Sequence, residues 1–484
     1  MKRLFGTDGM RGEAGRFPLD AATVRTVGRS LARHLSERLG RAPRVVLGRD
    51  TRVSGGWIEQ AFLAGSRAGG ARAESAGVIT TPGVAYLART LPADAGVVIS
   101  ASHNPFHDNG IKIFAPTGRK LDDATERLIE ADIYAEWETG ATPGADVPAP
   151  RASSESKEVD ESAAARVEVD EGNAQRVKEH NEEESRHAAL LRDFYLDYLA
   201  DEVADGLELE GLKIVVDCAN GAASGFAPEL LARLGAQVVS TFDAPDGRNI
   251  NLGCGSLHTD VLCQRVAEED AHLGVAFDGD ADRALFVDAR GRLVDGDATL
   301  WVLGGRMKER GELAGDRVVA TVMSNIGLEL ALHSRGVELV RTDVGDKYVL
   351  EELMRSGATL GGEQSGHVIL PRLSLAGDGM ITTLCLLRAM RDAGRSLEEL
   401  TEGFRRYPQV LVNVRVREKL PFEEVEEVAA AARAVRARLG ESGRLLLRYS
   451  GTEPLARVMI EGQSQEEIDA LAAGLAEVIR HRLG

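Results

Sequence analysis

Segments typical of β-strands alternate with segments typical of α-helices along most of this chain, and this alternation limits the fold more than any other feature. Three strand–helix–strand units recur, and such units form layered α/β domains with largely parallel sheets. The sequence therefore predicts three related α/β domains. The expected strands and helices of the units are 44–47, 57–68 and 77–79; 213–216, 227–234 and 237–240; and 317–322, 327–335 and 337–340.

The last part of the chain has a different pattern, because residues 410–416 alternate between apolar and polar like a half-exposed strand. A terminal helix is expected after Ser464, because Ser464 and Glu467 have the spacing of a capping box and an apolar face follows. We expect a small, separate α+β domain here. Its other expected elements are the strand 410–416, the helix 422–439 and the strands 444–448 and 456–461.

The length of 484 residues is too great for one hydrophobic core and indicates several domains. The acidic stretch 148–186 has few large apolar residues, which predicts a mobile insertion. A solvated helix is the alternative, because 163–186 is rich in helix formers. With this insertion set apart, the expected domains are 1–147, 187–293, 294–404 and 405–484.

The composition restricts the partners and the compartment. A formal net charge of −18 argues against nucleic acid as a partner, although local arginines can still bind a small phosphorylated substrate. Neither an apolar membrane span nor a secretion signal is recognisable, so we expect a cytoplasmic protein without a membrane partner. Cys218, Cys254, Cys263 and Cys385 show no metal-binding spacing, which indicates thiols in a reducing compartment.

Ser102 is the first candidate for chemistry. It follows the apolar run 96–99, which predicts a buried strand, and reactive groups are often delivered from the carboxyl ends of such strands. His103 and Lys112 would place an imidazole and an ammonium near its hydroxyl. The sequence leaves open whether Ser102 is a nucleophile or an ordinary turn serine.

Three aspartates, Asp278, Asp280 and Asp282, alternate with small residues directly after the strand candidate 273–277. Carboxylates this close repel one another unless a cation or solvent compensates them. Their oxygen ligands favour Mg²⁺ or Ca²⁺, and an EF-hand is excluded because Arg283 occupies the position of its invariant glycine. A metal site is favoured over a solvated acidic turn.

The segment 361–367 places Glu363, Ser365 and His367 among glycines. Glycines let the backbone approach a ligand closely, and the polar side chains suit a polyhydroxylated molecule. The segment therefore indicates a sugar-binding loop.

The segment 448–454, with Arg457 just beyond it, can direct several N–H and O–H donors and a guanidinium at one anion. It predicts a phosphate cradle, with a structural hairpin as the alternative. The chain has no Walker A pattern, so NTP hydrolysis is not indicated.

Taken in order, these motifs resemble those of the α-D-phosphohexomutase superfamily, from the first residues of the chain to its last domain. The resemblance implies an α/β fold with four domains around a central cleft, the first three related and the last α+β. The matching segments are 5–12, 48–55, 100–105 with 109–112, 278–283, 344–347, 361–367 and 448–454.

The resemblance also implies one functional motif in each domain: a phosphoserine in 1–147, a metal site in 187–293, a sugar site in 294–404 and a phosphate site in 405–484. The residues implied for catalysis are Ser102, Lys112, His103, Arg11, Arg283 and His367. Those implied for metal binding are Asp278, Asp280, Asp282 and the phosphate on Ser102. Those implied for substrate binding are Gly345, Glu363, Ser365, Arg448, Ser450, Gly451, Thr452 and Arg457.

The implied activity is an Mg²⁺-dependent transfer of a phosphoryl group within a hexose phosphate, through phosphoserine 102 and a hexose 1,6-bisphosphate intermediate. Glucosamine phosphates are favoured as substrates over mannose or glucose phosphates. The alternative hypotheses for the function are a non-catalytic phosphosugar-binding protein and a phosphatase. Lys112, His103 and His367 all remain candidates for the base, and the chain is expected to be a monomer or homodimer.

Two features depart from the superfamily pattern. The insertion 148–186 has no counterpart with a known role. Tyr449 stands where a lysine is frequent, which removes one cation from the phosphate cradle. Phosphate binding is still expected, because Arg448 and the residues after Tyr449 are retained.

Overall fold

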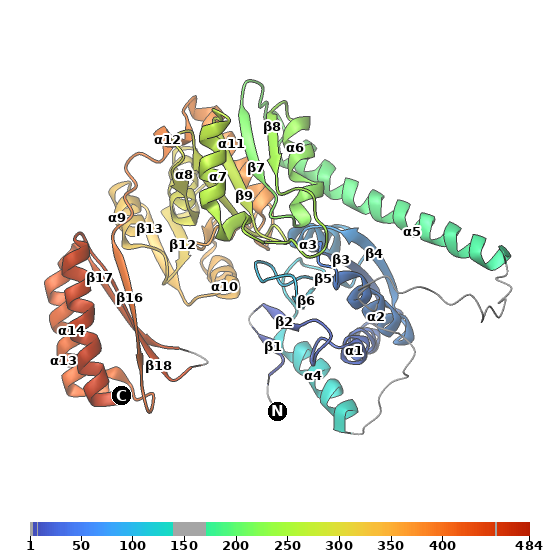
Figure 1. Cartoon of the computed structure of the whole chain (residues 1–484), viewed down its shortest axis with the longest axis horizontal. Helices are drawn as coiled ribbons and strands as arrows, with labels where there is room; N and C mark the ends of the chain where they lie inside the picture. Colours follow the sequence, from blue (N-terminus) through green and yellow to red (C-terminus); the bar gives the residue numbers. More distant parts are fainter. Residues whose placement is uncertain (1–2, 7, 139–170, 451–452) are drawn as a thin grey trace, which may run out of the picture. The chain divides into compact units, whose positions relative to one another are not determined.

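The computed structural model describes residues 3–6, 8–138, 171–450 and 453–484, with the side chains of 171–181 left aside. The chain divides into two compact units. Unit 1 comprises Met1–Leu293 and His367–Leu397, and unit 2 comprises Val294–Gly366 and Glu398–Gly484. The chain thus leaves unit 1, forms part of unit 2, and returns before completing unit 2 (Figure 1).

Unit 1 begins with a six-stranded mixed sheet of order β1-β2-β6-β5-β3-β4. β3, β4 and β5 are parallel, whereas β6, β2 and β1 follow in antiparallel pairs. The bounds are β1 Phe5–Gly6, β2 Gly9–Glu13, β3 Arg44–Arg49, β4 Arg72–Val78, β5 Ala95–Ile99 and β6 Asp108–Phe114. Every residue of β5 is buried, as its unbroken apolar run predicted.

Helices cover this sheet. α1, Ala21–Leu39, packs on α2, Gly55–Ala68, and on α4, Asp123–Glu138, while α3, Thr81–Thr90, packs on β3 and β5. The Asp20 side chain caps the start of α1 and Gly40, in the left-handed region, ends it. Buried side chains such as Leu31, Phe62 and Val97 form the core of this part.

The second sheet of unit 1 has the order β11-β10-β9-β7-β8. β7, β8 and β9 are parallel, but β10 pairs antiparallel with β9, so residues 278–283 are the reversal between two buried strands. The strands are β7 Lys213–Asp217, β8 Gln237–Thr241, β9 Leu273–Phe277, β10 Ala284–Asp288 and β11 Leu293–Val294; the helices are α6 Ala227–Arg233 and α7 Thr259–Glu268, with short 3₁₀ turns at Ala222–Gly225 and Gly255–Leu257.

A long helix precedes this sheet. α5 spans Glu171–Asp197 and continues into the π-helical turn η1, Tyr198–Val203. Of the two alternatives for the acidic insertion, the solvated helix is therefore present from Glu171 onward, and the boundary expected at residue 187 falls inside α5. The helix formers of this stretch explain why it is helical despite its polarity. Residues 148–170 lie outside the described residues.

The returning segment of unit 1 contains β15, Val368–Ile369, and α11, Gly379–Ala393. The Asp378 side chain caps α11 by accepting from the N–H groups of Met380 and Ile381. α11 packs on β10 and on η1.

Unit 2 contains three parallel strands in the order β13-β12-β14 and a separate antiparallel sheet of order β16-β18-β17. The antiparallel sheet packs with α13 and α14 around a core that includes Val458, Ile460 and Leu475. The strands are β12 Arg317–Thr321, β13 Glu338–Thr342, β14 Gly361–Gly362, β16 Gln409–Arg415, β17 Arg444–Tyr449 and β18 Leu455–Glu461; the helices are α8 Gly296–Glu309, α9 Ile326–Ser334, α10 Asp346–Ser356, α12 Leu397–Leu400, α13 Glu426–Leu439 and α14 Gln465–Leu483, with 3₁₀ turns at Ala314–Asp316, Phe422–Glu424 and Gly440–Ser442.

The expected strand–helix–strand units are present, and Ser464 caps α14 by accepting from the N–H of Glu467. The helix expected over 422–439 is instead a 3₁₀ turn followed by α13, with Val425 between them in an extended conformation. The glycine-rich segment 5–12, for which the sequence predicts no strand, forms most of β1 and β2 and buries Phe5 and Met10. No helix in the described part of the chain is both long and apolar enough to cross a membrane.

Candidate active site

Ser102 lies just beyond β5, in a left-handed backbone conformation with φ +53° and with 1% of its surface exposed. Its Oγ donates a hydrogen bond to Asp278 Oδ2 at 2.5 Å, and its N–H donates to Ser100 Oγ at 2.9 Å. The Nδ1 atom of His103 lies 3.4 Å from Ser102 Oγ. The serine is therefore held by its neighbours in a conformation that non-glycine residues rarely adopt, which is typical of functional sites.

Arg52 holds the loop that carries Ser102. Its side chain is fully buried, and its Nε donates to Asp50 Oδ2 at 2.8 Å. Its terminal nitrogens bind backbone carbonyls along the loop, so one cation fixes the path of the chain from Ser102 onward. These carbonyls belong to Ser102 at 2.9 Å, Asn104 at 2.8 Å, Pro105 and Asp108 at 3.1 Å.

The aspartates Asp278, Asp280 and Asp282 converge in the reversal between β9 and β10. One oxygen from each lies within 4.8 Å of the others, and all three side chains are buried. Within the described part of the chain, Asp280 Oδ1 and Asp282 Oδ1 have no hydrogen-bond partner. Burial and then the charges of Asp282 and Asp280 raise the pKa of Asp278 well above its usual range. Buried carboxylate oxygens without partners fit a hard divalent cation.

Glycine at position 279 allows this aspartate loop to approach the serine loop. A Cβ atom at Gly279 would lie 2.5 Å from the carbonyl oxygen of Ser102 and 2.9 Å from Asn251 Nδ2. The Asn251 amide also donates to the Ser102 carbonyl at 2.9 Å. The two loops are thus in backbone contact, and any side chain at 279 would separate them.

Lys112 extends from β6 into the same cluster and is 1% exposed. Its Nζ lies 2.9 Å from Asp280 Oδ2, 3.3 Å from Asp8 Oδ2 and 3.5 Å from Asp282 Oδ2. Burial alone would lower the pKa of Lys112, but these carboxylates raise it well above its usual range. Lys112 is therefore a charged ammonium.

Asp8 lies directly before β2 and forms ion pairs with residues of both β2 and β6. It forms ion pairs with Arg11, Lys112 and, at 2.7 Å, Lys120. Burial would raise the pKa of Asp8, yet Lys112, Lys120 and Arg11 hold it well below its usual range. The antiparallel pairing of Arg11 with Gly110 explains this convergence, because it aligns the two strands.

The remaining predicted residues of unit 1 are Arg283, His103 and His367. Arg283 borders the aspartates: its N–H donates to Asp278 Oδ1 at 3.2 Å, and its Nε lies 3.7 Å from Asp282 Oδ1. Burial, together with Arg283 and Arg11, lowers the pKa of His103. His367 is 4% exposed, and its ring lies so close to Gly377 that a Cβ there would overlap it.

In unit 2, Glu363 and Ser365 of the predicted sugar loop lie next to Gly345, the residue that the family resemblance added. The N–H of Gly345 donates to Glu363 Oε1 at 3.1 Å, and the Ser365 hydroxyl donates to Glu363 Oε2 at 3.3 Å. Gly345 has φ +134°, which only glycine adopts readily. Because Glu363 and Ser365 are only partly buried, their polar atoms remain accessible to a ligand.

The predicted phosphate cradle brings two arginines together in unit 2. Arg448 on β17 and Arg457 on β18 are directly opposite partners in the antiparallel sheet. Burial and then the charge of Arg457 lower the pKa of Arg448. Like charges in this position repel, so an anion bound between them would stabilise the pair.

Ser450 lies beside these arginines, with its Oγ 3.4 Å from an Arg457 nitrogen. Its carbonyl accepts from Lys419 Nζ at 2.6 Å, so a cation that the motif did not include supports the same turn. Gly451 and Thr452 lie outside the described residues. The Tyr449 side chain packs against its neighbours. Its ring stacks on Phe422 at 4.2 Å, and its hydroxyl donates to the Leu420 carbonyl at 2.5 Å.

The structure also identifies site residues that the motifs did not assign. Arg52, Asp50 and Asn251 hold the serine loop, and Asp8 pairs with Lys112. Asp8 and Asp50 lie inside segments that matched the superfamily, so their polar, glycine-rich surroundings were the available signal. Asn251 and Lys419 lie in loops without such a pattern.

Comparison with known families gives four matches in chain order. The matching descriptions are "Phosphoglucomutase/phosphomannomutase, alpha/beta/alpha domain I" for residues 2–139, domain II for 193–291, domain III for 295–407 and the C-terminal domain for 411–478. Residues 140–192 lie between the first two matches, a stretch that includes the whole of the expected insertion 148–186.

Full-length relatives are phosphoglucosamine mutases. The protein of this name from Solibacter usitatus is 47% identical over 483 residues, which cover 100% of this chain and 99% of the relative. That from Syntrophotalea carbinolica is 44% identical over 483 residues, covering 100% and 98%.

Solved structures share the fold at low sequence identity. A phosphoglucomutase/phosphomannomutase family protein from Burkholderia thailandensis has a TM-score of 0.73 at 22% identity, with 99% of this chain and 97% of that chain covered. The N-acetylphosphoglucosamine mutase of Aspergillus fumigatus, solved with GlcNAc-6P and magnesium, has a TM-score of 0.61 at 21% identity, with 99% and 95% covered.

Proposed function

The chain belongs to the phosphoglucomutase/phosphomannomutase family, and from this premise we propose that it interconverts glucosamine 6-phosphate and glucosamine 1-phosphate. It is thus an isomerase that acts by intramolecular phosphoryl transfer. The observation that carries the proposal is the placement of the Ser102 hydroxyl, 2.5 Å from a carboxylate of the buried aspartate cluster. A serine in this setting suits a carrier of a phosphoryl group bound beside a cation.

In the first half of the proposed reaction, Ser102 carries the phosphoryl group before the substrate binds. The C1 hydroxyl oxygen of glucosamine 6-phosphate attacks phosphorus and its proton passes to a base, while the bond from phosphorus to Ser102 Oγ breaks and Oγ takes up a proton, which it gives up again in the second half. The product is glucosamine 1,6-bisphosphate. In the second half, Ser102 Oγ attacks the phosphorus at C6, and the C6 oxygen takes up a proton, which leaves glucosamine 1-phosphate and restores the phosphoserine.

The cluster around Ser102 would neutralise the charge of the transferring group. Lys112 supplies a buried ammonium, and Arg11 and Arg283 supply guanidinium groups beside it. Asp278, Asp280 and Asp282 fit Mg²⁺, which when bound would stabilise the negative charge on the phosphoryl oxygens. Phosphoryl transfer needs positioning and charge stabilisation above all, and this cluster provides both.

Of the three candidate bases, the geometry favours His103. Its Nδ1 lies 3.4 Å from Ser102 Oγ, within reach of a short adjustment to a hydrogen bond. Lys112 is engaged by three carboxylates, and the His367 ring lies against Gly377. We therefore assign proton transfer at Ser102 to His103, and electrostatic stabilisation to Lys112.

Unit 2 would bind the substrate by its other groups. Glu363 and Ser365 can hydrogen-bond the sugar hydroxyls or amino group, while Arg448, Ser450 and Arg457 grip the phosphate that is not being transferred. The same residues would hold each end of the bisphosphate in turn. We place this reaction in the cytoplasm and expect a monomer or homodimer.

Localisation of phosphate by intact-mass measurement tests the carrier directly. We expect a phosphate adduct on Ser102 that disappears on incubation with excess glucosamine 6-phosphate, as the bisphosphate is released, and returns with hexose 1,6-bisphosphate. An adduct confined to another residue would contradict the mechanism.

Substrate specificity requires a separate test, because mannose or glucose phosphates are the alternative substrates with the same chemistry. Turnover of the three hexose phosphates measured side by side should favour glucosamine phosphate, in line with the relatives' names. A strong preference for mannose phosphate would overturn this assignment. Release of inorganic phosphate would indicate a phosphatase, and binding without turnover a non-catalytic protein.

A further inference from the structure

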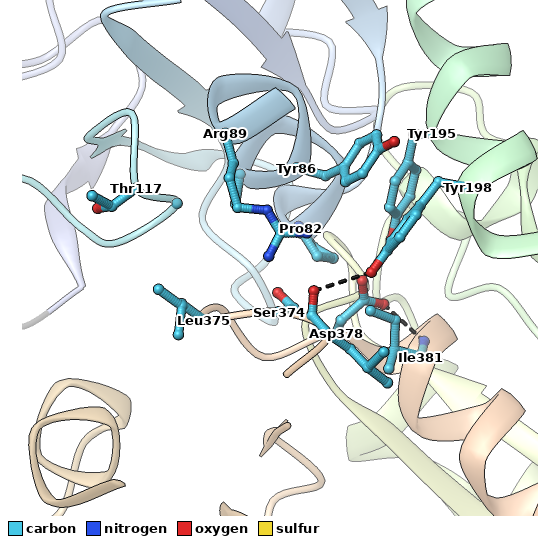
Figure 2. A pocket seen from close by; sticks show the side chains of 13 residues that line it. Pro82, Tyr86, Arg89, Thr117, Tyr195, Tyr198, Ser374, Leu375, Asp378 and Ile381 are labelled. Carbon is cyan, nitrogen blue, oxygen red and sulfur yellow. Dashed lines mark hydrogen bonds between the residues drawn. The ribbon is translucent and has the colours of Figure 1, made fainter. Parts of the chain in front are cut away.

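Tyr195 lies at the end of α5, outside every motif that the sequence singled out, and is fully buried. Its hydroxyl donates to Asp378 Oδ2 at 2.7 Å, and its ring packs against Tyr86 at 5.6 Å and Phe226 at 5.9 Å. Figure 2 shows Tyr195 and Asp378 turned toward each other. A buried phenol aimed at a buried carboxylate fixes both groups firmly.

The cavity beside Tyr195 and Asp378 is too small to be a ligand site, so ligand binding does not explain why these two residues are paired. The cavity has a volume of about 10 Å³, which is space for about one water molecule. Tyr86, Tyr198 and Ser374 are among the residues around it (Figure 2). The importance of Tyr195 must therefore lie in what it holds in place.

On one side, Tyr195 holds the start of α11. Asp378 Oδ1 accepts from the N–H groups of Met380 and Ile381, while Oδ2 accepts from Tyr195. The next residue, Gly379, donates its N–H to the Ala281 carbonyl of the aspartate loop at 3.0 Å. A Cβ at Gly379 would lie 2.7 Å from the Arg283 carbonyl, so α11 begins directly against this loop.

On the other side, the Tyr195 hydroxyl contacts the Thr80 side chain, which caps α3. The next residue, Thr81, donates its hydroxyl to Asp280 Oδ2 at 2.5 Å and its N–H to the Asp280 carbonyl at 2.9 Å. The phenol thus reaches the aspartate loop by two routes, one through its hydrogen bond to Asp378 and one through its contact with Thr80. The routes end at Asp280 and at Ala281, next to Asp282.

We propose that Tyr195 is a positioning residue for the metal site. Through Thr80–Thr81 and through Asp378–Gly379, it holds the loop 278–283 in the conformation that brings the three carboxylates together. The inference deepens the proposed function, since it concerns the same metal site. It also gives the end of the helix that precedes the second domain a role in the chemistry of the chain.

Substitution of Tyr195 by phenylalanine tests the proposal, because it removes one hydroxyl and keeps the ring. Direct binding of Mn²⁺, used in place of Mg²⁺, is measured by electron paramagnetic resonance on preparations matched for Ser102 phosphorylation. We expect affinity to fall by about tenfold, since a hydrogen bond to a charged group is lost but the ligands remain. Activity should show a matching rise in the Mg²⁺ concentration for half-maximal rate, with kcat at saturating Mg²⁺ nearly restored.

Tyr198→Phe is the matched control. Tyr198 lies three residues on, stacks on Tyr86 at 4.3 Å and donates to the Leu373 carbonyl at 3.1 Å. It is not connected to Asp378 by a hydrogen bond in the described structure, so its loss should lower stability without changing Mn²⁺ affinity. Unchanged Mn²⁺ affinity in Tyr195→Phe, or an equal loss in both variants, would overturn the proposal.

A second variant keeps the test decisive if Tyr195→Phe does not fold. Thr80→Ser retains the cap hydroxyl and Thr80→Ala removes it, so only the alanine variant should weaken Mn²⁺ binding. Equal Mn²⁺ affinity for both would also overturn the proposal. Because Mn²⁺ binding is read without turnover, the proposed function can fail while this inference stands, and the reverse.

Discussion

Lys112 in unit 1 and Arg448 in unit 2 are both cations of the proposed site, but their surroundings differ. Lys112 lies within 3.5 Å of three carboxylates, so its charge is already compensated inside the protein. Arg448 faces Arg457, a charge of the same sign. The charge of Lys112 is therefore balanced within unit 1 before substrate binds, whereas we expect the arginine pair of unit 2 to be stabilised by a bound anion.

The largest effect should come from Ser102→Ala. Loss of the phosphoryl carrier should reduce turnover by at least about 10⁴-fold, because no other group can take its place in the chemical step. Substrate affinity, measured by calorimetry, should change by less than about threefold, because unit 2 binds the other phosphate. Substantial remaining mutase activity would show that Ser102 is not the carrier and would remove the chemical role from unit 1.

The next largest effect should follow Lys112→Met. Removal of the buried ammonium leaves the buried carboxylate of Asp280 without its cation, which should cost about 3–5 kcal/mol of unfolding free energy in urea titrations. Lys120→Met is the control, because Lys120 is more exposed and its ion pair with Asp8 should contribute no more than about 1 kcal/mol. Equal losses of unfolding free energy in the two variants would mean that Lys112 is not the cation that compensates the buried carboxylates of unit 1.

Arg448→Met should behave in the opposite way. KM should rise by about 10- to 100-fold, as expected for loss of a charge-assisted contact with phosphate, with kcat less affected. The free energy of unfolding should stay constant or increase slightly, since a repulsion is removed. Arg433→Met, an exposed arginine on α13, is the control. Destabilisation as large as that of Lys112→Met would contradict the contrast between the units.

The last effect is a pH dependence and concerns Asp217, a buried carboxyl of unit 1 outside the Lys112 cluster. Burial raises the pKa of Asp217 to about 6. Since the folded pKa exceeds the unfolded one, the carboxyl stabilises the fold fully below about pH 4, and this contribution is lost as the pH rises through about 6. The change across this pH range should be roughly 3 kcal/mol, and Asp217→Asn should flatten it in urea titrations at several pH values. An unchanged pH profile in the variant would assign the titration to another group.

Sequence patterns predicted the parts of the molecule that depend on near neighbours. The buried strand before Ser102, the carboxylates after β9 and the capping box at Ser464 are all local, and the structure contains each of them. Both Arg448 and Arg457 were also identified from one short segment.

What sequence alone could not give was the pairing between distant segments. Asp8 meets Lys112 only because β2 and β6 pair antiparallel in a particular register, which no local pattern contains. In the sequence, Arg52 is a polar residue in a loop. Its complete burial depends on hydrogen bonds to carbonyls some 50 residues further along the chain. The helical form of 171–197 was only one of two alternatives, because composition does not distinguish a solvated helix from a mobile acidic segment.

The burial of Ser102 has a consequence for how the enzyme is primed after synthesis. A protein kinase needs an exposed, extended peptide, but Ser102 is 1% exposed, has a left-handed backbone and is fixed by Arg52 and Asn251 through its carbonyl. Presenting it to a macromolecular kinase would require the loop to unfold. The first phosphate should therefore come from a small donor that can enter the site, so that metabolite levels rather than signalling cascades would set the active fraction of the enzyme.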